Sequence, residues 1–157
     1  MIHITLLAVG KCRQLHFRNA AQDYAQRLKH YAVYSEIEVK ETRAAGHVPI
    51  NSVLHQEGER LIQALPKGSY AIALHPAGQT STSEALSKRL STLTGQGKNH
   101  LTFMLGGAFG LSEDVLAQAN WCLSLSAMTF PHELARVILL EQLYRVFTIM
   151  RGESYHK

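Results

Sequence analysis

The stretch LSLSAMTFPHELARVILLEQLYRVF, residues 123–147, changes character twice. The segment 121–125 is short and mostly apolar, which predicts a buried strand. The segment 126–132 begins with small and hydroxylated residues and contains a proline, which predicts a loop. From Glu133 onward the pattern predicts a long helix that is apolar on most of its circumference. A buried strand that leads through a loop into a helix is the building unit of a parallel sheet covered by helices. This stretch therefore favours an α/β fold.

The rest of the chain repeats this strand–helix unit. The predicted strands cover residues 2–9, 35–40, 70–74, 101–105 and 121–125, and the predicted helices cover residues 15–31, 50–65, 81–93, 112–119 and 133 onward. A capping box from Ser81 to Glu84 and a cap at Ser112 mark two helix starts. Alternating charges in residues 36–40 predict a strand at the sheet edge with one wet face. Residues 42–49 are predicted to be a loop, and the length favours one domain over residues 1–157.

Composition limits the possible functions. Apolar residues make up 46% of the chain and charged residues 18%, which is typical of a globular protein. The net charge of +4 permits an anionic partner such as RNA but does not require one. Cys12 and Cys122 lie far apart and no Cys/His spacing fits a metal, so no metal site is expected. Without a signal peptide or a run of about 18 apolar residues, the sequence predicts a cytoplasmic protein with no membrane partner.

Three predicted loops follow the carboxyl ends of strands and are rich in small residues. They are HPAGQ (residues 75–79), GGAFG (residues 106–110) and SAMTFPH (residues 126–132). Ligands of open α/β sheets bind at this edge, where small residues let a ligand lie against the backbone. Turn formation alone explains any single Gly-rich loop, but three at one edge favour a binding site.

The sequence favours an uncharged, nucleoside-like ligand over a phosphate. GGAFG does not match GxGxxG, because Leu105 stands where the first glycine would fall, and the chain has no Walker motif. Glu113 and Asp114 open the short helix that follows and would repel a phosphate there. A flavodoxin-like binder of small molecules would need phosphate-cradling loops, so this alternative is disfavoured.

Four segments together resemble the RlmH family of SPOUT methyltransferases. They are ITLLAVGK (residues 4–11), LGGAFGL (residues 105–111), LSLSAMTFPHELARVILLEQLYR (residues 123–145) and RGESYHK (residues 151–157). The resemblance covers essentially the whole chain and implies a C-terminal trefoil knot and an obligate homodimer. It also implies an S-adenosylmethionine-dependent enzyme that methylates N3 of a pseudouridine, of the position 1915 type. That base lies in helix 69 of 23S rRNA on assembled 70S ribosomes, so a DNA partner is not expected.

The resemblance further implies a cofactor site. Residues 126–130 would belong to the knot and wrap the cofactor, while backbone groups hold the adenine. The implied cofactor-binding residues are Leu74, Gly106, Leu125, Ser126, Ala127, Met128, Thr129 and Phe130.

The last predicted helix is apolar on more than the face that would cover its own sheet. Its remaining apolar face would need a second subunit to cover it; burial of the whole helix within one monomer is the alternative.

Four residues are candidates for catalysis. A ring imide nitrogen must lose its proton before or during methylation. His132 stands at the helix start beside the cofactor loop and could accept that proton, and Arg136 could stabilise an anion or bind phosphate. The resemblance implies that Tyr155 and His156 close over the active site, within one subunit or across the dimer. The structural alternatives are a packing histidine, an ion-paired arginine and a frayed tail.

Basic residues offer possible contacts for RNA phosphates. Lys11, Arg13 and Arg18 cluster after the first strand, and Arg43 and His47 lie in the second loop. A solvated surface is the alternative. A chain without an appended RNA-binding domain has to recognise a preformed shape, which suits a ribosome. Two other functions stay open: a SPOUT methyltransferase of transfer RNA, and a ribosome-associated module that binds cofactor without catalysis.

Overall fold

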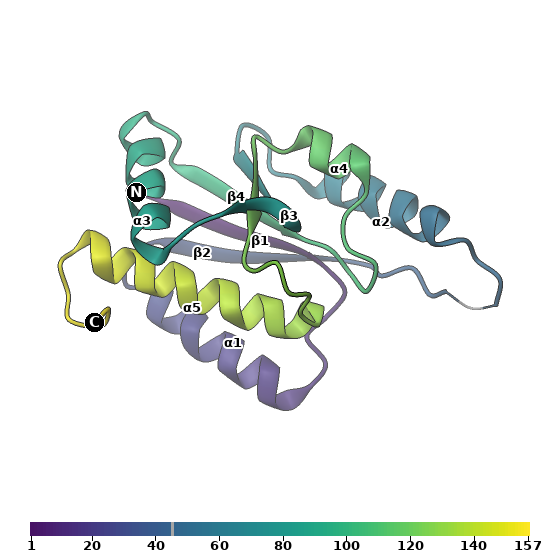
Figure 1. The fold of residues 1–157 in the computed structure, drawn as a ribbon, viewed down its shortest axis with the longest axis horizontal. Helices are drawn as coiled ribbons and strands as arrows, with labels where there is room; N and C mark the ends of the chain where they lie inside the picture. The colour runs from purple at the N-terminus through teal and green to yellow at the C-terminus, as the bar shows by residue number, and fades with distance from the viewer. Residues whose placement is uncertain (45) are drawn as a thin grey trace.

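The computed structural model describes residues 1–44 and 46–157 and shows the predicted alternation of strands and helices (Figure 1). The strands are β1 (His3–Val9), β2 (Val33–Val39), β3 (Tyr70–Thr80), β4 (His100–Leu105) and β5 (Trp121–Ser124). The helices are α1 (Leu15–Leu28), α2 (Ile50–Ala64), α3 (Ser83–Gly95), α4 (Glu113–Gln118) and α5 (His132–Met150). The described strands pair in parallel in the order β2-β1-β4-β3-β5. The predicted α/β fold with a parallel sheet is confirmed.

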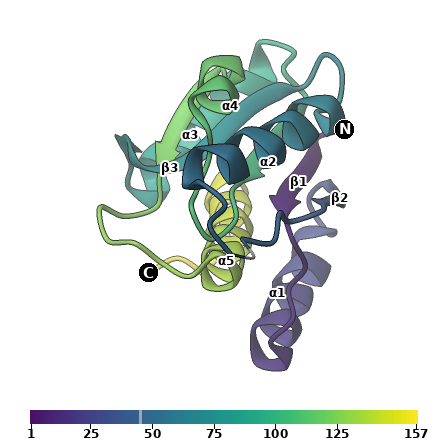
Figure 2. The same cartoon turned by 90° about the vertical axis from the view of Figure 1, so that its right-hand side faces the viewer.

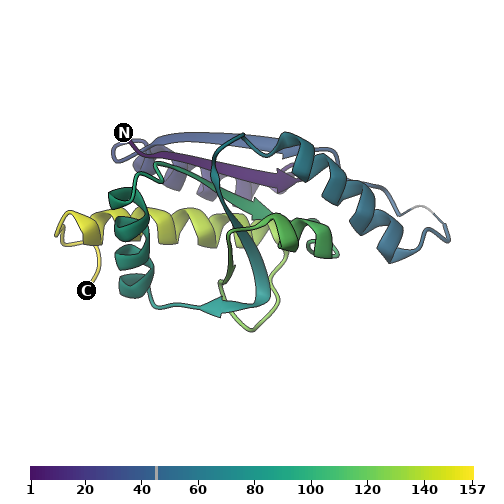
Figure 3. The ribbon, with the colours of Figure 1, turned by 90° about the horizontal axis from the view of Figure 1, so that it is seen from above.

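Helices cover both faces of the sheet. Helices α1, α3 and α5 pack on one face, and α2 and α4 pack on the other (Figures 2 and 3). Successive side chains of a strand point to opposite faces. In β1, Ile4 and Leu6 accordingly join the core beneath the first set of helices, whereas Leu7 joins the core beneath the second. This two-sided cover explains why the central strands are apolar throughout.

The observed boundaries of most elements differ from the predicted ones by a few residues, as three examples show. Strand β2 lies at the sheet edge, as predicted, but begins at Val33 because Val33 N donates to Ile2 O at 2.9 Å. Helix α1 ends at Leu28 rather than at residue 31, since the N–H groups of Tyr31 and Ala32 both turn back to the carbonyl of Leu28. Helix α5 begins at His132, one residue before the predicted start.

Of the two predicted helix caps, one is confirmed and one is wrong. Ser112 caps α4, since its hydroxyl accepts from Val115 N at 3.3 Å. The cap of α3 is Thr82 rather than Ser81, because the Thr82 hydroxyl accepts from Ala85 N at 3.1 Å. The Ser81 hydroxyl instead donates to the backbone carbonyl of Thr82.

The prediction that β3 ends at residue 74 and is followed by a loop was wrong. The strand continues to Thr80, with an irregularity between Leu74 and Gln79 that bulges the intervening residues. Gln79 resumes pairing with β5, and its side-chain carbonyl accepts from Trp121 Nε1 at 3.0 Å. A Cβ on Gly78 would stand 2.8 Å from the backbone of Leu123, so this close approach requires glycine.

The predicted loop 42–49 includes Ala45, which lies outside the described residues; the rest of that segment forms neither helix nor strand. Within residues 1–44 and 46–157, no helix has the length and apolar character needed to cross a membrane. Over the same residues, no cluster of three or more His, Cys, Asp or Glu side chains is placed to hold a metal ion.

Candidate functional site

The bulge of β3 and the segments that follow β4 and β5 surround one cavity of about 330 Å³ at the carboxyl edge of the sheet. Its lining consists of Leu74, His75, Pro76, Leu105, Gly106, Gly107, Ala108, Phe109, Gly110, Leu125, Ser126, Met128, Thr129, Phe130, His132 and Ala135. This volume lies within the range of small-molecule sites. Among the described lining residues there is no Lys, Arg, Asp or Glu, so the cavity suits an uncharged group better than a phosphate.

The segment 106–110 is a tight turn that depends on its glycines. Gly110 N donates to Gly107 O at 3.1 Å, and Gly110 has a φ of +83°, a conformation that favours glycine. A Cβ on Gly106 would overlap the backbone of Gly110. At Gly106, Gly107 and Gly110 the turn therefore presents backbone to the cavity, while Ala108 and Phe109 add side chains to its lining.

The segment between β5 and α5 forms the opposite wall. The Ser126 hydroxyl accepts from Met128 N at 3.0 Å, which folds this segment into a local turn. Met128 is 75% exposed, and Phe109 across the cavity is 43% exposed. Two large apolar side chains at the rim of one cavity are available for contact with a ligand or a partner.

Helix α5 begins at the cavity wall. His132 is its first residue and lines the cavity. The adjacent Glu133 is buried and points away, accepting from the backbone N–H groups of Gln14 at 3.0 Å and of Arg13. Burial alone would raise the pKa of Glu133. These hydrogen bonds and one from Cys12 outweigh burial and hold that pKa below its usual range. The Glu133 carboxylate thus fixes the start of α5, and with it His132, to the segment after β1.

Nearly all of the residues predicted to bind the cofactor line the cavity. Leu74, Gly106, Leu125, Ser126, Met128, Thr129 and Phe130 line it, whereas Ala127 lies in the same turn but not in the lining. Ala135 was missed, although it follows His132 by one helical turn and so shares its face.

A family model described as "Predicted SPOUT methyltransferase" matches residues 2–156. The chain belongs to the SPOUT methyltransferase family. Full-length relatives carry the name ribosomal RNA large subunit methyltransferase H. The one from Shouchella clausii is 45% identical over 159 residues, covering 99% of this chain and 100% of its own. The one from Pelotomaculum thermopropionicum is 45% identical over 163 residues, covering 99% of both chains.

Solved structures share the fold of this SPOUT methyltransferase at low sequence identity. A probable methyltransferase from Bordetella pertussis Tohama I matches with a TM-score of 0.56 at 13% identity, covering 93% of this chain and 96% of its own. A Legionella pneumophila protein solved in complex with the bound cofactor SAM matches with a TM-score of 0.51 at 12% identity, covering 90% and 65%. At this identity the likeness concerns the fold alone.

Arg136 of this SPOUT methyltransferase lies away from the cavity. It is 2% exposed, its Nη1 binds the carboxylates of Glu38 at 2.7 Å and of Glu36, and its Nη2 donates to Gly10 O at 3.1 Å. Burial alone would lower the pKa of Arg136, but these two carboxylates outweigh burial and raise it. The face of β2 that was predicted to be exposed to water is therefore occupied in part by this ion-pair site. Arg136 makes the ion pair that the sequence analysis gave as the alternative to a catalytic role.

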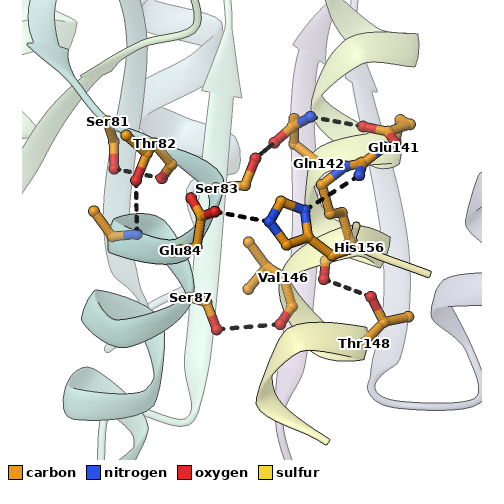
Figure 4. Close-up of polar contacts among 12 residues, drawn as sticks. Ser81, Thr82, Ser83, Glu84, Ser87, Glu141, Gln142, Val146, Thr148 and His156 are labelled. Carbon is orange, nitrogen blue, oxygen red and sulfur yellow. Dashed lines mark hydrogen bonds and ion pairs between the residues drawn. The ribbon is translucent and has the colours of Figure 1, made fainter. Parts of the chain in front are cut away.

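The C-terminal tail is held at the other end of α5 (Figure 4). His156 Nε2 lies 2.7 Å from Glu84 Oε1 on α3, and its Nδ1 lies 3.3 Å from Arg145 Nη1. The Tyr155 hydroxyl donates to Glu141 at 3.1 Å. At 1.5 Å per residue, Arg145 is roughly 20 Å along the helix from the cavity wall. Neither Tyr155 nor His156 lines the cavity of this chain.

The basic residues that were predicted to contact RNA lie in different surroundings from one another. Lys11 and Arg18 line a second hollow, of about 230 Å³, beside Arg136. Arg13 is engaged in an ion pair with Glu41, and Arg43 is exposed in the segment after β2. His47 is also exposed in that segment. The first group follows β1, so it lies on the same sheet edge as the cavity.

Proposed function

We propose that this chain transfers a methyl group from S-adenosylmethionine to N3 of a pseudouridine, of the position 1915 type, in helix 69 of 23S rRNA on assembled 70S ribosomes. The observation that carries the proposal is the uncharged cavity built by the segments 106–110 and 125–130. Its support comes from full-length relatives named ribosomal RNA large subunit methyltransferase H. We further propose a single domain over residues 1–157, a C-terminal trefoil knot and a cytoplasmic location, where ribosomes are found.

The residues of the cavity fit the proposed cofactor. Gly106 and the backbone of residues 125–130 would hold the adenosine, and Leu74 would contact it from β3. We include Ala127, whose small side chain belongs to the same turn. When bound, S-adenosylmethionine supplies a methyl group activated by a positively charged sulfur. The chain's own task is to exclude water and align the target nitrogen with that methyl group.

The proposed base is His132, because it lines the cavity and lies on the rigid start of α5. Tyr155 and His156 would complete the site from the partner of a homodimer, since their own protomer holds them far from its cavity. Leu134, Ile138 and Ile149 are only half-buried on α5, which leaves apolar surface for a second subunit. We propose for Arg136 a supporting role beneath the substrate surface.

Gly106→Ala is expected to abolish measurable cofactor binding while the protein still folds. The added methyl group would overlap the Gly110 backbone, so the turn that forms one cavity wall has to open. Isothermal titration calorimetry with S-adenosylmethionine measures this loss. Gly95→Ala is the matched control, since a Cβ there meets no described atom within 4 Å. Wild-type affinity in Gly106→Ala would remove the turn from the binding site.

The proposed reaction is tested by transfer of labelled methyl from S-adenosylmethionine to three substrates. These are 70S ribosomes that lack the modification, naked 23S rRNA and bulk transfer RNA. We expect label on ribosomes, mapped to N3 of a helix 69 pseudouridine. Label on transfer RNA would keep the cofactor and overturn the substrate. Bound cofactor without any transfer would favour the non-catalytic binding module.

A further inference from the structure

A second large hollow lies at the amino edge of the sheet, opposite the candidate cofactor cavity. This amino-edge hollow has a volume of about 640 Å³ and lies between the turn after α1, the first residues of β2 and the residue after α5. Figures 1 and 3 show these segments together at the end of the molecule where β1 begins and α5 ends. Its lining residues are Met1, Lys29, His30, Tyr31, Ala32, Val33, Tyr34 and Arg151. The proposed chemistry assigns this hollow no task.

The charged side chains that line the amino-edge hollow are basic. Lys29 and Arg151 are exposed there, and His30 adds an exposed imidazole. Over residues 1–44 and 46–157, the lining includes no Asp or Glu, and neither Lys29 nor Arg151 takes part in an ion pair. Because no neighbouring carboxylate neutralises them, these cations attract an anionic partner to the hollow.

Aromatic packing holds Arg151 at the hollow. Its Cζ atom lies 4.8 Å from the centre of the Tyr31 ring, and the Tyr31 ring stacks on that of Phe147 of α5 with 6.0 Å between ring centres. The nearby acid Glu153 is already engaged, because the Tyr31 hydroxyl donates to its Oε2 at 2.5 Å. A guanidinium that rests on a ring uses its face for that contact and keeps its N–H donors for a phosphate.

The amino-edge hollow is remote from the cavity of its own protomer. Helix α5 has 19 residues, with His132 at the cavity wall and Arg151 directly after its last residue. At 1.5 Å per residue the two sites are roughly 28 Å apart along this helix. One partner that occupies both sites has to be anionic and extended over that distance. The phosphate backbone of folded ribosomal RNA meets both conditions.

We propose that the amino-edge hollow is a second contact surface for ribosomal RNA, where Lys29, His30 and Arg151 bind phosphates of a segment outside the target nucleotide. This inference rests on the proposed function, in which ribosomal RNA is the substrate. Phosphate contacts fix the position of a protein on a nucleic acid without reading bases. The hollow therefore adds affinity and orientation to the contacts offered by Lys11 and Arg18 at the opposite sheet edge, and it takes no part in the transfer of the methyl group.

The double variant Lys29→Gln, Arg151→Gln tests the proposal, because it removes two positive charges from the hollow and keeps polar side chains. With 70S ribosomes that lack the modification, we expect KM to rise about 10-fold at physiological salt. The value of kcat at saturating ribosomes and the affinity for S-adenosylmethionine should not change. The dependence of log KM on log salt concentration should become less steep by about 1 to 2, since each lost phosphate contact removes part of the slope.

A matched control removes the same charge elsewhere. Lys67 and Lys98 are exposed lysines outside the lining of the hollow, so Lys67→Gln, Lys98→Gln should keep the wild-type KM and salt dependence. An equal rise of KM in this control would mean that net charge alone attracts the ribosome, which overturns the proposal. Because Arg151→Gln also loses a contact with Tyr31, Lys29→Gln is measured alone and should show about half of the change in slope. Lys29→Arg keeps the charge and should keep the wild-type KM.

Cross-linking identifies the partner directly. A thiol-reactive cross-linker on Lys29→Cys is expected to label 23S rRNA above the background of the wild-type protein, whose Cys12 is buried and whose Cys122 is half-buried. Label on a ribosomal protein alone would replace RNA by an acidic protein and overturn the proposal.

Three further results would also overturn it. They are a double variant with wild-type KM and salt slope, a loss of kcat at saturating ribosomes with unchanged KM, and a change of oligomeric state by size-exclusion chromatography. The last result would make the hollow a contact between subunits. In each case the wild-type enzyme still methylates ribosomes, so the proposed function stands. A wild-type enzyme that methylates no RNA would overturn the proposed function, and this inference would fall with it.

Discussion

Replacing Arg136 with Met is expected to lower the free energy of unfolding by about 3 kcal/mol, because it leaves two neighbouring carboxylates without their cation. Arg136 is 2% exposed and bridges Glu36 and Glu38 on β2, while also donating to Gly10 O after β1. The two glutamate side chains remain 31% and 30% exposed, so water can partly solvate them and the loss lies at the lower end of the range for buried pairs. Urea unfolding of the two proteins measures the difference.

Two controls define the cause of this loss. Arg27→Ala removes an exposed pair with Asp23, whose nitrogen–oxygen distance is 3.0 Å, and is expected to cost about 0.3 kcal/mol. The triple variant Arg136→Met, Glu36→Gln, Glu38→Gln removes the orphaned charges and should recover much of the lost stability. If Arg136→Met is as stable as Arg27→Ala, the buried ion-pair site is not structural, and Arg136 is again available for contact with an anionic substrate.

The fold was largely predictable because each element buries a face whose period is visible in the sequence. The stretch 121–147 shows this best, since an apolar strand, a loop of small residues and an apolar helix follow one another there. Strand β3 was predicted too short because Pro76 and Gly78 suggest a loop. Its continuation depends on pairing of Gln79 with β5, and such a contact between distant residues leaves no local pattern.

The cavity was predictable for a related reason: small residues after parallel strands leave room for a ligand at one edge. The positions of the charged residues near the cavity could not be predicted from the sequence. Glu36 and Glu38 alternate as on a wet strand face, yet Arg136, about 100 residues away in sequence, lies across them. Glu57 is a single acid in the amphipathic helix α2, where it is expected to face solvent, yet it is only 4% exposed. Its burial follows from how Gly58 and Gly107 let backbone segments approach, which only the structure shows.

Neither His132→Ala nor His156→Ala is expected to methylate ribosomes at more than about one hundredth of the wild-type rate, while both should bind S-adenosylmethionine. The reason differs for each variant. His132 lines the cavity and is the proposed base, whereas His156 is held by Glu84 and Arg145 at the far end of α5. Single-turnover methyl transfer and calorimetry measure the two effects separately.

Mixing the two inactive variants shows which subunit supplies the tail. If His156 serves the cavity of its partner, a mixed dimer combines an intact His132 from one protomer with an intact His156 from the other. Half of the dimers in an equal, exchanged mixture are mixed and each has one complete site, so about a quarter of wild-type activity should return. A tail that serves its own protomer leaves every site incomplete, and the mixture stays inactive. Because the contacts with Glu84 and Arg145 hold His156 roughly 20 Å along α5 from its own cavity, recovery is the expected result.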